Sequence, residues 1–263
     1  MIKGILTDMD GTILNSEGQL SPYTKSVIEK LLNKGVKLAV ASGRLFPSIH
    51  DIFKEFNQEI IYTCNNGTWI ENSSRTKIYH KSVFSHSEMI SILNLIKTKT
   101  KYGSFVCTSD YAATDKHYDY IDEAFKLSDS KLNIMSDLTE LEDEVTKITI
   151  CILEGIDELS KVLSKELGDK YKLVISGDIW LDIIKNGDSK ANAFPILHDE
   201  LGIKPEEMLI FGDYDNDIDM LSMSPNSFAM ADASPAAKSA ASFIIGKNDD
   251  HAVAKKIEEL IAL

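Results

Sequence analysis

The residues best suited to chemistry in this sequence are acids that follow short apolar segments. Asp8 ends the apolar segment 5–8, and Asp10 follows two positions later. Alternate residues of an extended segment point the same way, so both carboxylates would face one edge of a sheet. They repel one another unless a cation or a shared proton relieves them, and Mg²⁺ commonly binds one or two carboxylates together with a substrate phosphate. Gly11 permits a sharp turn after them; the alternative is an Asx-rich turn that caps the next element.

A second group of acids follows another apolar segment, 208–211. If a helix begins near Asp215, the side chains of Asp213 and Asp217 can converge on one cation. The alternative is a helix N-terminus whose acids complement the helix dipole. Two acidic groups at the ends of two strands favour a metal site.

Two weaker signals concern phosphate. Ser42 and Gly43 follow the apolar segment 36–41 and lead into a predicted helix, an arrangement whose hydroxyl and N–H groups can hold a phosphate. An ordinary turn is the alternative. Lys190 stands where the chain returns to strand and helix alternation, although a single lysine is more often a solvated surface residue.

The elements that position these residues alternate between strand and helix at both ends of the chain. This alternation predicts a parallel sheet covered by helices, with the polar strand ends at its carboxyl edge, where open α/β sheets bind ligands. Ser21, Pro22 and Gly35 are a predicted N-cap, first residue and stop of the first helix. The predicted strands are 5–8, 36–41, 60–64, 208–211, 227–230 and 243–245, and the predicted helices are 22–34, 46–56, 189–202 and a last one containing Val253 and Ile257.

The middle of the chain has neighbouring strands, which indicate antiparallel pairing. After a hairpin at 68–81, helices are predicted at 86–100, 117–127 and 157–167, and strands at 104–114, 147–153, 172–176 and 180–185. The predicted fold class is therefore α/β, a Rossmann-like parallel-sheet core with an inserted α+β cap domain. The core would comprise residues 1–82 and 187–263, and the cap residues 83–186.

Composition limits the classes of partner. The chain has 263 residues and a formal net charge of −13, and an acidic surface repels nucleic-acid phosphates and anionic membranes. Cys64, Cys107 and Cys151 form no CxxC pair and are predicted to be buried thiols. The N-terminus turns acidic before a signal-peptide core could form, and no apolar run reaches the roughly 20 residues that span a bilayer. We therefore expect a cytoplasmic protein without nucleic-acid or membrane partners; the oligomeric state is open.

Taken together, the motifs resemble those of the haloacid dehalogenase-like superfamily, and within it the Cof-type subclass with a large α+β cap. The matching segments are DMDGT at 8–12, ASGR at 41–44, NNGT at 65–68, SK at 189–190, GDYDNDIDML at 212–221 and FAMADASPAAKSAA at 228–241. The chain departs from the subclass at Ala191, Ala231, Asp232 and His251, which could alter loop shape or substrate fit. These four departures leave the motif acids, the Ser42 hydroxyl and Lys190 in place.

The resemblance implies a Mg²⁺-dependent phosphatase that acts on small phosphorylated metabolites, with sugar phosphates as the expected class, through an aspartyl-phosphate intermediate. Asp8 would be the nucleophile and Asp10 the general acid and then base. Mg²⁺ would be held by Asp8, the backbone carbonyl of Asp10 and Asp213, with Asp217 in support. Ser42, Gly43, Asn216 and Lys190 would bind the phosphoryl oxygens, and Lys190 would also neutralise charge around Asp8.

Two alternatives remain open, and one specificity site is predicted. A phosphomutase of the same superfamily would return the phosphoryl group to substrate, whereas a phospho-accepting signalling receiver is shorter and accepts on its third strand. The cap would supply specificity and exclude water. Trp180 and Asp182 alternate onto one face of a strand and could offer a sugar a stacking plane and an acceptor; alternatively, Trp180 packs the core of the cap.

Overall fold

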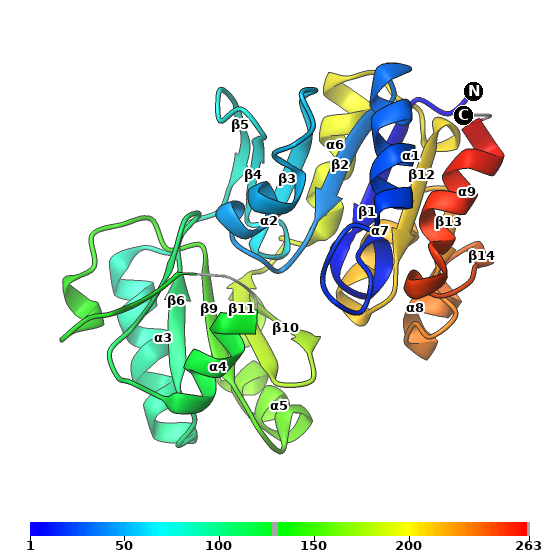
Figure 1. The fold of residues 1–263 in the computed structure, drawn as a ribbon. Helices are drawn as coiled ribbons and strands as arrows, with labels where there is room; N and C mark the ends of the chain where they lie inside the picture. The colour runs from blue at the N-terminus through cyan, green and yellow to red at the C-terminus, as the bar shows by residue number, and fades with distance from the viewer. Residues whose placement is uncertain (128–130, 262–263) are drawn as a thin grey trace.

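The computed structural model of the protein describes residues 1–127 and 131–261. Two β-sheets with packed helices make up these residues (Figure 1). The larger sheet has the strand order β14-β13-β12-β1-β2-β3-β4-β5. The strands from β14 to β3 run parallel, whereas β4 and β5 add to one edge as antiparallel strands. Their bounds are β1 Gly4–Asp8, β2 Lys37–Ala41, β3 Ile61–Cys64, β4 Trp69–Asn72, β5 Ile78–Lys81, β12 Met208–Gly212, β13 Ser227–Ala229 and β14 Phe243–Ile244.

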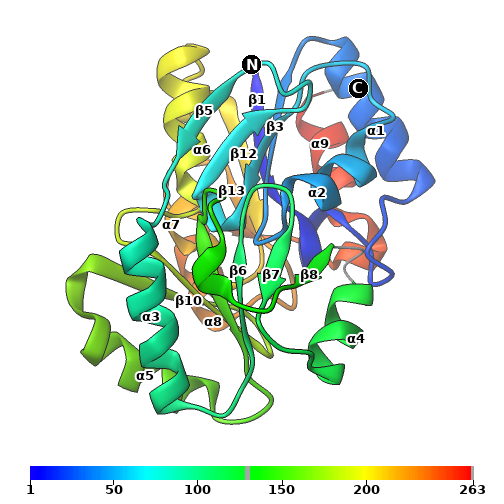
Figure 2. The same ribbon diagram turned by 90° about the vertical axis from the view of Figure 1, so that its left-hand side faces the viewer.

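Helices cover both faces of this sheet. Helices α1 and α9 lie on one face and α6 on the other (Figure 2). Central strands buried on both faces need continuous apolar runs, and β1 and β12 are buried along their whole length. The helix bounds are α1 Pro22–Asn33, α2 Phe46–Phe53, α6 Ala193–Pro195, α7 Ile218–Leu221, α8 Pro235–Ala240 and α9 Ala252–Ile261.

Helix α1 shows how local sequence sets an element. The Ser21 hydroxyl accepts from the Thr24 N–H, Pro22 is the first helical residue, and Gly35 follows the end with a φ of 79°. The predicted cap, start and stop are confirmed. The predicted helix over 189–202 is a continuous helical stretch that changes type along its length: a 3₁₀ turn (Lys190–Asn192), the short α6 and a π-helical turn (Ile196–Glu200). Pro195 has no N–H for the helical hydrogen-bond ladder, which accounts for a change of hydrogen bonding there.

The smaller sheet has the order β10-β11-β9-β6-β7-β8, antiparallel except for the β7–β8 pair. Helices α3 and α5 cover one face and α4 lies against the other (Figure 2). Strand β8, which the sequence did not predict, is a short edge strand without alternation between buried and exposed residues. The bounds are α3 His86–Lys99, β6 Ser104–Cys107, β7 Ala112–Thr114, α4 Asp119–Leu127, β8 Leu132–Ile134, β9 Lys147–Cys151, α5 Ile156–Leu167, β10 Tyr171–Gly177 and β11 Trp180–Lys185.

The expectation that the cysteines are buried thiols is met. Cys64, Cys107 and Cys151 are buried free thiols. None of the described helices has the length and apolar character that crossing a membrane requires.

Candidate active site

Acids and hydroxyls gather at the carboxyl edge of the larger sheet. Strand β1 pairs with β2 and β12, so Asp8 lies opposite Ala41, and Thr7 opposite Phe211. The first residues beyond the neighbouring strands, Ser42 and Asp213, are therefore brought beside Asp8. Parallel pairing in this register explains how motifs far apart in the sequence meet.

The turn after β1 shapes the position of Asp213. Residues Met9–Ile13 form a non-helical turn, closed by the Leu14 N–H, which donates to the Met9 carbonyl over 3.0 Å, and Gly11 has a φ of 77° within it. A Cβ atom on Gly11 would lie 2.5 Å from Oδ2 of Asp213, so glycine permits this approach both by its conformation and by its lack of a side chain. The Thr12 hydroxyl then donates to Oδ1 of Asp213 over 2.8 Å.

Lys190 joins two of the acids. Its Nζ donates to Oδ1 of Asp8 and to Oδ1 of Asp217, each over 2.6 Å, and its exposed fraction is 2%. Burial favours the neutral amine, but the carboxylates of Asp217 and Asp8 outweigh it and raise the pKa of Lys190. This burial agrees with the expectation that Lys190 belongs to the site and is not a solvated surface residue. A Cβ on Gly67 would lie 1.9 Å from the carbonyl oxygen of Ser189, so Gly67 lets the backbone before Lys190 approach.

Three carboxylates form a pocket suited to a cation. Among the described residues, one ligand oxygen from each of Asp8, Asp213 and Asp217 lies within 4.8 Å of the other two. Asp217 also accepts from the N–H groups of Asp213 and Tyr214, over 2.9 and 3.1 Å. The sequence-predicted convergence of Asp213 and Asp217 is therefore present, together with Asp8.

The charges in this pocket are incompletely compensated. Burial, and then Asp217, raises the pKa of Asp213 to about 6. Burial also raises the pKa of Asp8, against the opposing effect of Lys190. The buried Oδ2 of Asp8 accepts no hydrogen bond from any described residue. An orphaned carboxylate oxygen beside two further acids fits a hard divalent cation such as Mg²⁺.

Asp10 lies apart from these three acids. Its carboxylate is half-exposed and accepts from Nε and Nη2 of Arg44, over 2.8 and 2.6 Å. The spacing argument placed the Asp8 and Asp10 carboxylates together, but the turn at Gly11 follows Asp10 directly and takes its side chain toward β2. The negative charge of Asp10 is therefore balanced by an ion pair with Arg44. The sequence argument missed this partner, although Arg44 belongs to the ASGR motif at 41–44.

The predicted phosphate-binding residues lie around the same edge. Ser42 is buried and its hydroxyl accepts from the Arg44 N–H over 3.2 Å. Asn216 donates to Oδ1 of Asn66 over 3.1 Å, and its own buried Oδ1 accepts from no described residue. Ser42, Gly43 and Arg44 line a cavity, whereas Asn216, which is hydrogen-bonded to Asn66, is not among its lining residues.

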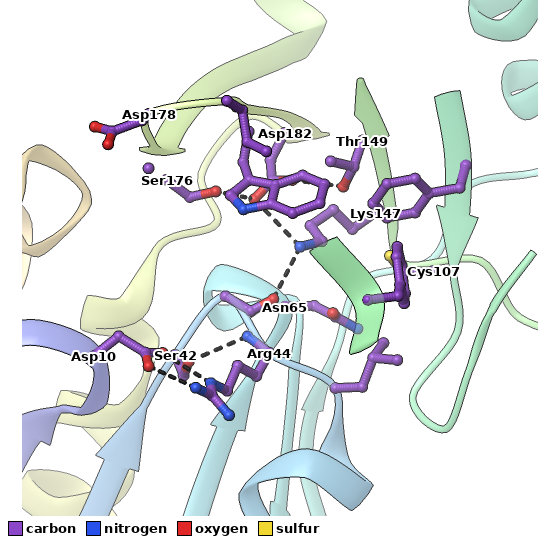
Figure 3. A pocket seen from close by; sticks show the side chains of 17 residues that line it. Asp10, Ser42, Arg44, Asn65, Cys107, Lys147, Thr149, Ser176, Asp178 and Asp182 are labelled. Atoms are coloured by element: carbon purple, nitrogen blue, oxygen red, sulfur yellow. Dashed lines mark hydrogen bonds and ion pairs between the residues drawn. The ribbon is translucent and has the colours of Figure 1, made fainter. Parts of the chain in front are cut away.

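This cavity, of about 570 Å³, lies between the two sheets (Figure 3). Asp10, Ser42 and Arg44 form one side of it and residues of β6, β9 and β11 another. Trp180 and Asp182 both line it, as their predicted common face requires. Trp180 also packs edge-on against Phe105 and Phe125, so it both packs the smaller sheet and faces the cavity.

Asp182 differs from its predicted role. It is 0% exposed, and its two oxygens accept from Asn66, Thr149, Ser176 and Lys147 over 2.6, 2.5, 2.8 and 3.2 Å. Four donors leave it little capacity to accept from a sugar hydroxyl. The prediction of Asp182 as a sugar acceptor is therefore not supported, because strand alternation cannot show which donors surround a side chain.

The comparison with known proteins gives the family. The sequence profile described as haloacid dehalogenase-like hydrolase matches residues 5–257. The chain belongs to this family. One relative of the hydrolase is the 5-amino-6-(5-phospho-D-ribitylamino)uracil phosphatase YbjI of Escherichia coli, 29% identical, with 99% of this chain and 96% of YbjI covered. The HMP-PP phosphatase of Klebsiella pneumoniae is 26% identical over 90% of this chain and 87% of its own length.

Solved structures of similar fold cover the whole hydrolase. SMU.1108c from Streptococcus mutans has a TM-score of 0.91 and 24% identity, with both chains covered completely. TM0651 from Thermotoga maritima has a TM-score of 0.86 and 25% identity, covering 99% of this chain and 98% of its own. The family resemblance and the α/β fold class predicted from the sequence are confirmed, and the phosphatase names of the relatives support a phosphoric monoester hydrolase.

The departures from the family motifs lie around the site rather than in it. Ala191 is buried next to Lys190, whereas Ala231 and Asp232 are exposed. His251 has a φ of 57°, the left-handed conformation in which glycine is favoured. The hydrolase keeps its motif acids, Ser42 and Lys190 in the positions described above.

Proposed function

We propose that this hydrolase is a Mg²⁺-dependent phosphatase that cleaves phosphate monoesters of small metabolites through a phosphorylated Asp8. The observation that carries the proposal is the state of the Asp8 carboxylate. One oxygen is held by Lys190, and the other is buried without a donor among the described residues, beside two further acids. A carboxylate acting as a nucleophile divides one difficult displacement into two easier steps.

In the first step, an Asp8 oxygen bonds to phosphorus while the ester P–O bond breaks, and Asp10 gives its proton to the leaving alcohol. In the second step, Asp10 takes a proton from water, the water oxygen attacks phosphorus, and the bond to Asp8 breaks. Inorganic phosphate is released and Asp8 is restored. One group thus serves as acid and then base.

The other residues position the phosphoryl group and neutralise its negative charge. Lys190, Ser42 and the Gly43 N–H bind phosphoryl oxygens, with Asn216 at the side. The guanidinium of Arg44 holds Asp10, and Arg44 directly follows Ser42 and Gly43 in the wall of the cavity. An incoming phosphoryl group competes with Asp10 for Arg44 and so frees Asp10 to move its proton.

Mg²⁺ would be held by Asp8, Asp213 and the Asp10 carbonyl, with Asp217 in support, and it would supply positive charge to the transferring phosphoryl group. We also propose that residues 83–186 act as the cap over a core of 1–82 and 187–263. The cap closes the cavity and gives specificity among small phosphorylated metabolites. Sugar phosphates are one class to test, although protein donors already occupy the Asp182 carboxylate that was expected to accept from a sugar hydroxyl.

The test is phosphate release from a panel of phosphorylated metabolites, with Mg²⁺ and with EDTA. We expect Asp8→Asn to fold normally and to lose at least about 1,000-fold in kcat, because it removes the nucleophile. The matched control is Asp232→Asn, since Asp232 is exposed and outside the site. Substantial turnover by Asp8→Asn, or full activity in EDTA, would refute the proposal, and transfer to substrate in place of phosphate release would indicate a phosphomutase.

A further inference from the structure

Asp182 is fully buried, although β11 places it at the cavity between the two sheets. Burial of a carboxylate costs free energy unless donors replace the lost water, and Asp182 has four. Three of them belong to the smaller sheet. The fourth is the amide of Asn66, which lies in the turn after β3 of the larger sheet and donates over 2.6 Å. Two of these partners, Asn66 and Lys147, also contact the loop 42–44, where phosphate binding is proposed.

The backbone of Asn66 holds the peptide that presents the Gly43 N–H. The N–H of Asn66 donates to the Ser42 carbonyl over 3.0 Å. This carbonyl and the Gly43 N–H belong to one planar trans peptide, so they point in opposite directions. The contact therefore directs the Gly43 N–H away from the Asn66 backbone, and this N–H donates to no acceptor among the described residues. It stays available for a phosphoryl oxygen, as proposed above.

The side chain of Asn66 fixes a second donor. A carboxylate only accepts hydrogen bonds, so Asp182 requires the NH₂ group of Asn66 to face it. The Oδ1 of Asn66 then faces the other way and accepts from the amide nitrogen of Asn216 over 3.1 Å. The second N–H of that nitrogen has no acceptor in the part of the chain that the structure describes. Asp182 thus sets the direction of two amides in series and leaves Asn216 able to donate to a phosphoryl oxygen.

Lys147 forms a second link from Asp182 to the loop 42–44. Its Nζ donates to Asp182 over 3.2 Å and to the Gly43 carbonyl over 2.9 Å (Figure 3). That carbonyl belongs to the peptide after the Gly43 Cα, and Asn66 holds the peptide before it. A glycine has more backbone freedom than other residues, so contacts on both of its peptides are what keep the Gly43 N–H in one direction.

We propose that Asp182 is a positioning residue for the phosphoryl group rather than a contact to the rest of the substrate. Through Asn66 and Lys147, it holds the N–H of Gly43 and the amide of Asn216 in the directions that phosphoryl oxygens require. Donors that are fixed before the substrate binds need no reorganisation during phosphoryl transfer. This inference rests on the proposed function and deepens it, because affinity for the phosphoryl group then depends on a contact between the two sheets.

Asp182→Asn tests the inference, with Glu71→Gln as its control. Asparagine keeps the shape of the side chain but can donate as well as accept, so the Asn66 amide is no longer held in one direction. Glu71 is also buried and accepts from Nε1 of Trp69 over 3.0 Å, but it does not line the cavity. Calorimetry with inorganic phosphate and Mg²⁺ should show a Kd about tenfold higher in Asp182→Asn, because donors to a charged group are misdirected. Glu71→Gln should leave the Kd unchanged.

Turnover separates this role from contact with the leaving alcohol, since Asp182 itself lines the cavity. A positioning role predicts that kcat/KM falls by the same factor, about tenfold, for every phosphate ester that the enzyme cleaves. A loss confined to some esters, with the Kd for inorganic phosphate unchanged, would show contact with the alcohol and overturn the inference. An equal rise in Kd for Asp182→Asn and Glu71→Gln would also overturn it, because it would show only a general effect on the fold.

Asn66→Gly tests the path between Asp182 and Asn216. Glycine keeps the backbone N–H and suits the φ of 59° at this position, so only the linking amide is lost. We expect this variant to raise the Kd for inorganic phosphate. Combined with Asp182→Asn, it should lose clearly less affinity than the product of the two single losses. Fully multiplicative losses would show that Asp182 acts by another path and would overturn the inference.

Folding and the proposed function are checked separately. Circular dichroism shows whether each variant is folded. If Asp182→Asn is not, Asn66→Gly still decides, since Asn66 does not line the cavity and an unchanged Kd there overturns the inference. If the native chain binds inorganic phosphate but releases none from any ester, the proposed function fails and the Kd comparison still tests the positioning. If the native chain binds no inorganic phosphate, the inference is overturned.

Discussion

Replacing Lys190 with methionine is the sharpest perturbation of the acidic pocket. Lys190 is the cation that contacts both Asp8 and Asp217, and all three side chains are at most 5% exposed. Methionine keeps much of the length of the side chain and removes its charge. The two carboxylates are then left in a buried environment with a third, Asp213, close by.

The size of the effect follows from burial. Removing one partner of a buried ion pair costs about 3–5 kcal/mol, because the remaining charge is neither paired nor solvated. Lys190 serves two acids, so we expect a loss near the upper end of this range in EDTA. Mg²⁺ supplies positive charge to the same acids, so part of the loss should be recovered when the ion is added at a concentration far above its Kd.

Lys147→Met is the matched comparison. Lys147 is similarly buried against Asp182, but Asp182 keeps three other donors, Asn66, Thr149 and Ser176. Its loss of stability should therefore be clearly smaller than that of Lys190→Met. Urea unfolding followed by circular dichroism, in EDTA and in Mg²⁺, gives both values. If Lys190→Met unfolds within about 1 kcal/mol of the native chain in EDTA, the account of the pocket is wrong.

Two further outcomes follow from other groups. Asp213→Asn should reduce the rise in Tm that Mg²⁺ produces and should raise the Tm in EDTA by about 2–4 °C, because one of three repelling carboxylates is lost; an undiminished Mg²⁺ effect would contradict this. Lys170 and the N-terminal cap of α3 hold the pKa of Glu88 well below its usual range, so the ionised form stabilises the fold above the unfolded pKa of about 4.3. Glu88→Gln keeps a side chain that can cap α3 but removes the charge, and should cost about 1 kcal/mol at pH 7. In urea unfolding, the difference in free energy of unfolding between this variant and the native chain should narrow as the pH falls below about 4; a constant difference would count against stabilisation by the ionised carboxylate.

The positions of the main site residues could be predicted because they depend on strand ends. Asp8 ends a short apolar strand, Ser42 and Asp213 come directly after two others, and parallel pairing brings such ends to one edge. The ends of α1 were similarly predictable, because cap and stop residues act within one helical turn. Strand ends and helix caps depend on residues that are close together in the sequence, so the sequence alone is enough to predict them.

The partners of individual side chains were not predictable. The Asp10–Arg44 pair depends on how the turn at Gly11 directs the chain. Three donors to Asp182 (Lys147, Thr149 and Ser176) come from strands paired in its own sheet, and the fourth, Asn66, comes from the turn after β3. Strand pairing in the smaller sheet and the way the two sheets meet decide these contacts, and no spacing rule gives either. A signal for Lys147 did exist: it shares a strand face with Thr149 in a segment that is otherwise apolar, as a lysine buried for a specific partner would.

The covalent state of Asp8 during turnover tests the central claim most directly. The protein is mixed with 4-nitrophenyl phosphate and Mg²⁺, quenched in acid within the first turnovers, reduced with borohydride and analysed by peptide mass spectrometry. An acyl phosphate is reduced to an alcohol, so the account predicts homoserine at position 8, aspartate at position 10, and no reduction in Asp8→Asn. Steady phosphate release with unmodified Asp8, or with homoserine at another position, would contradict it.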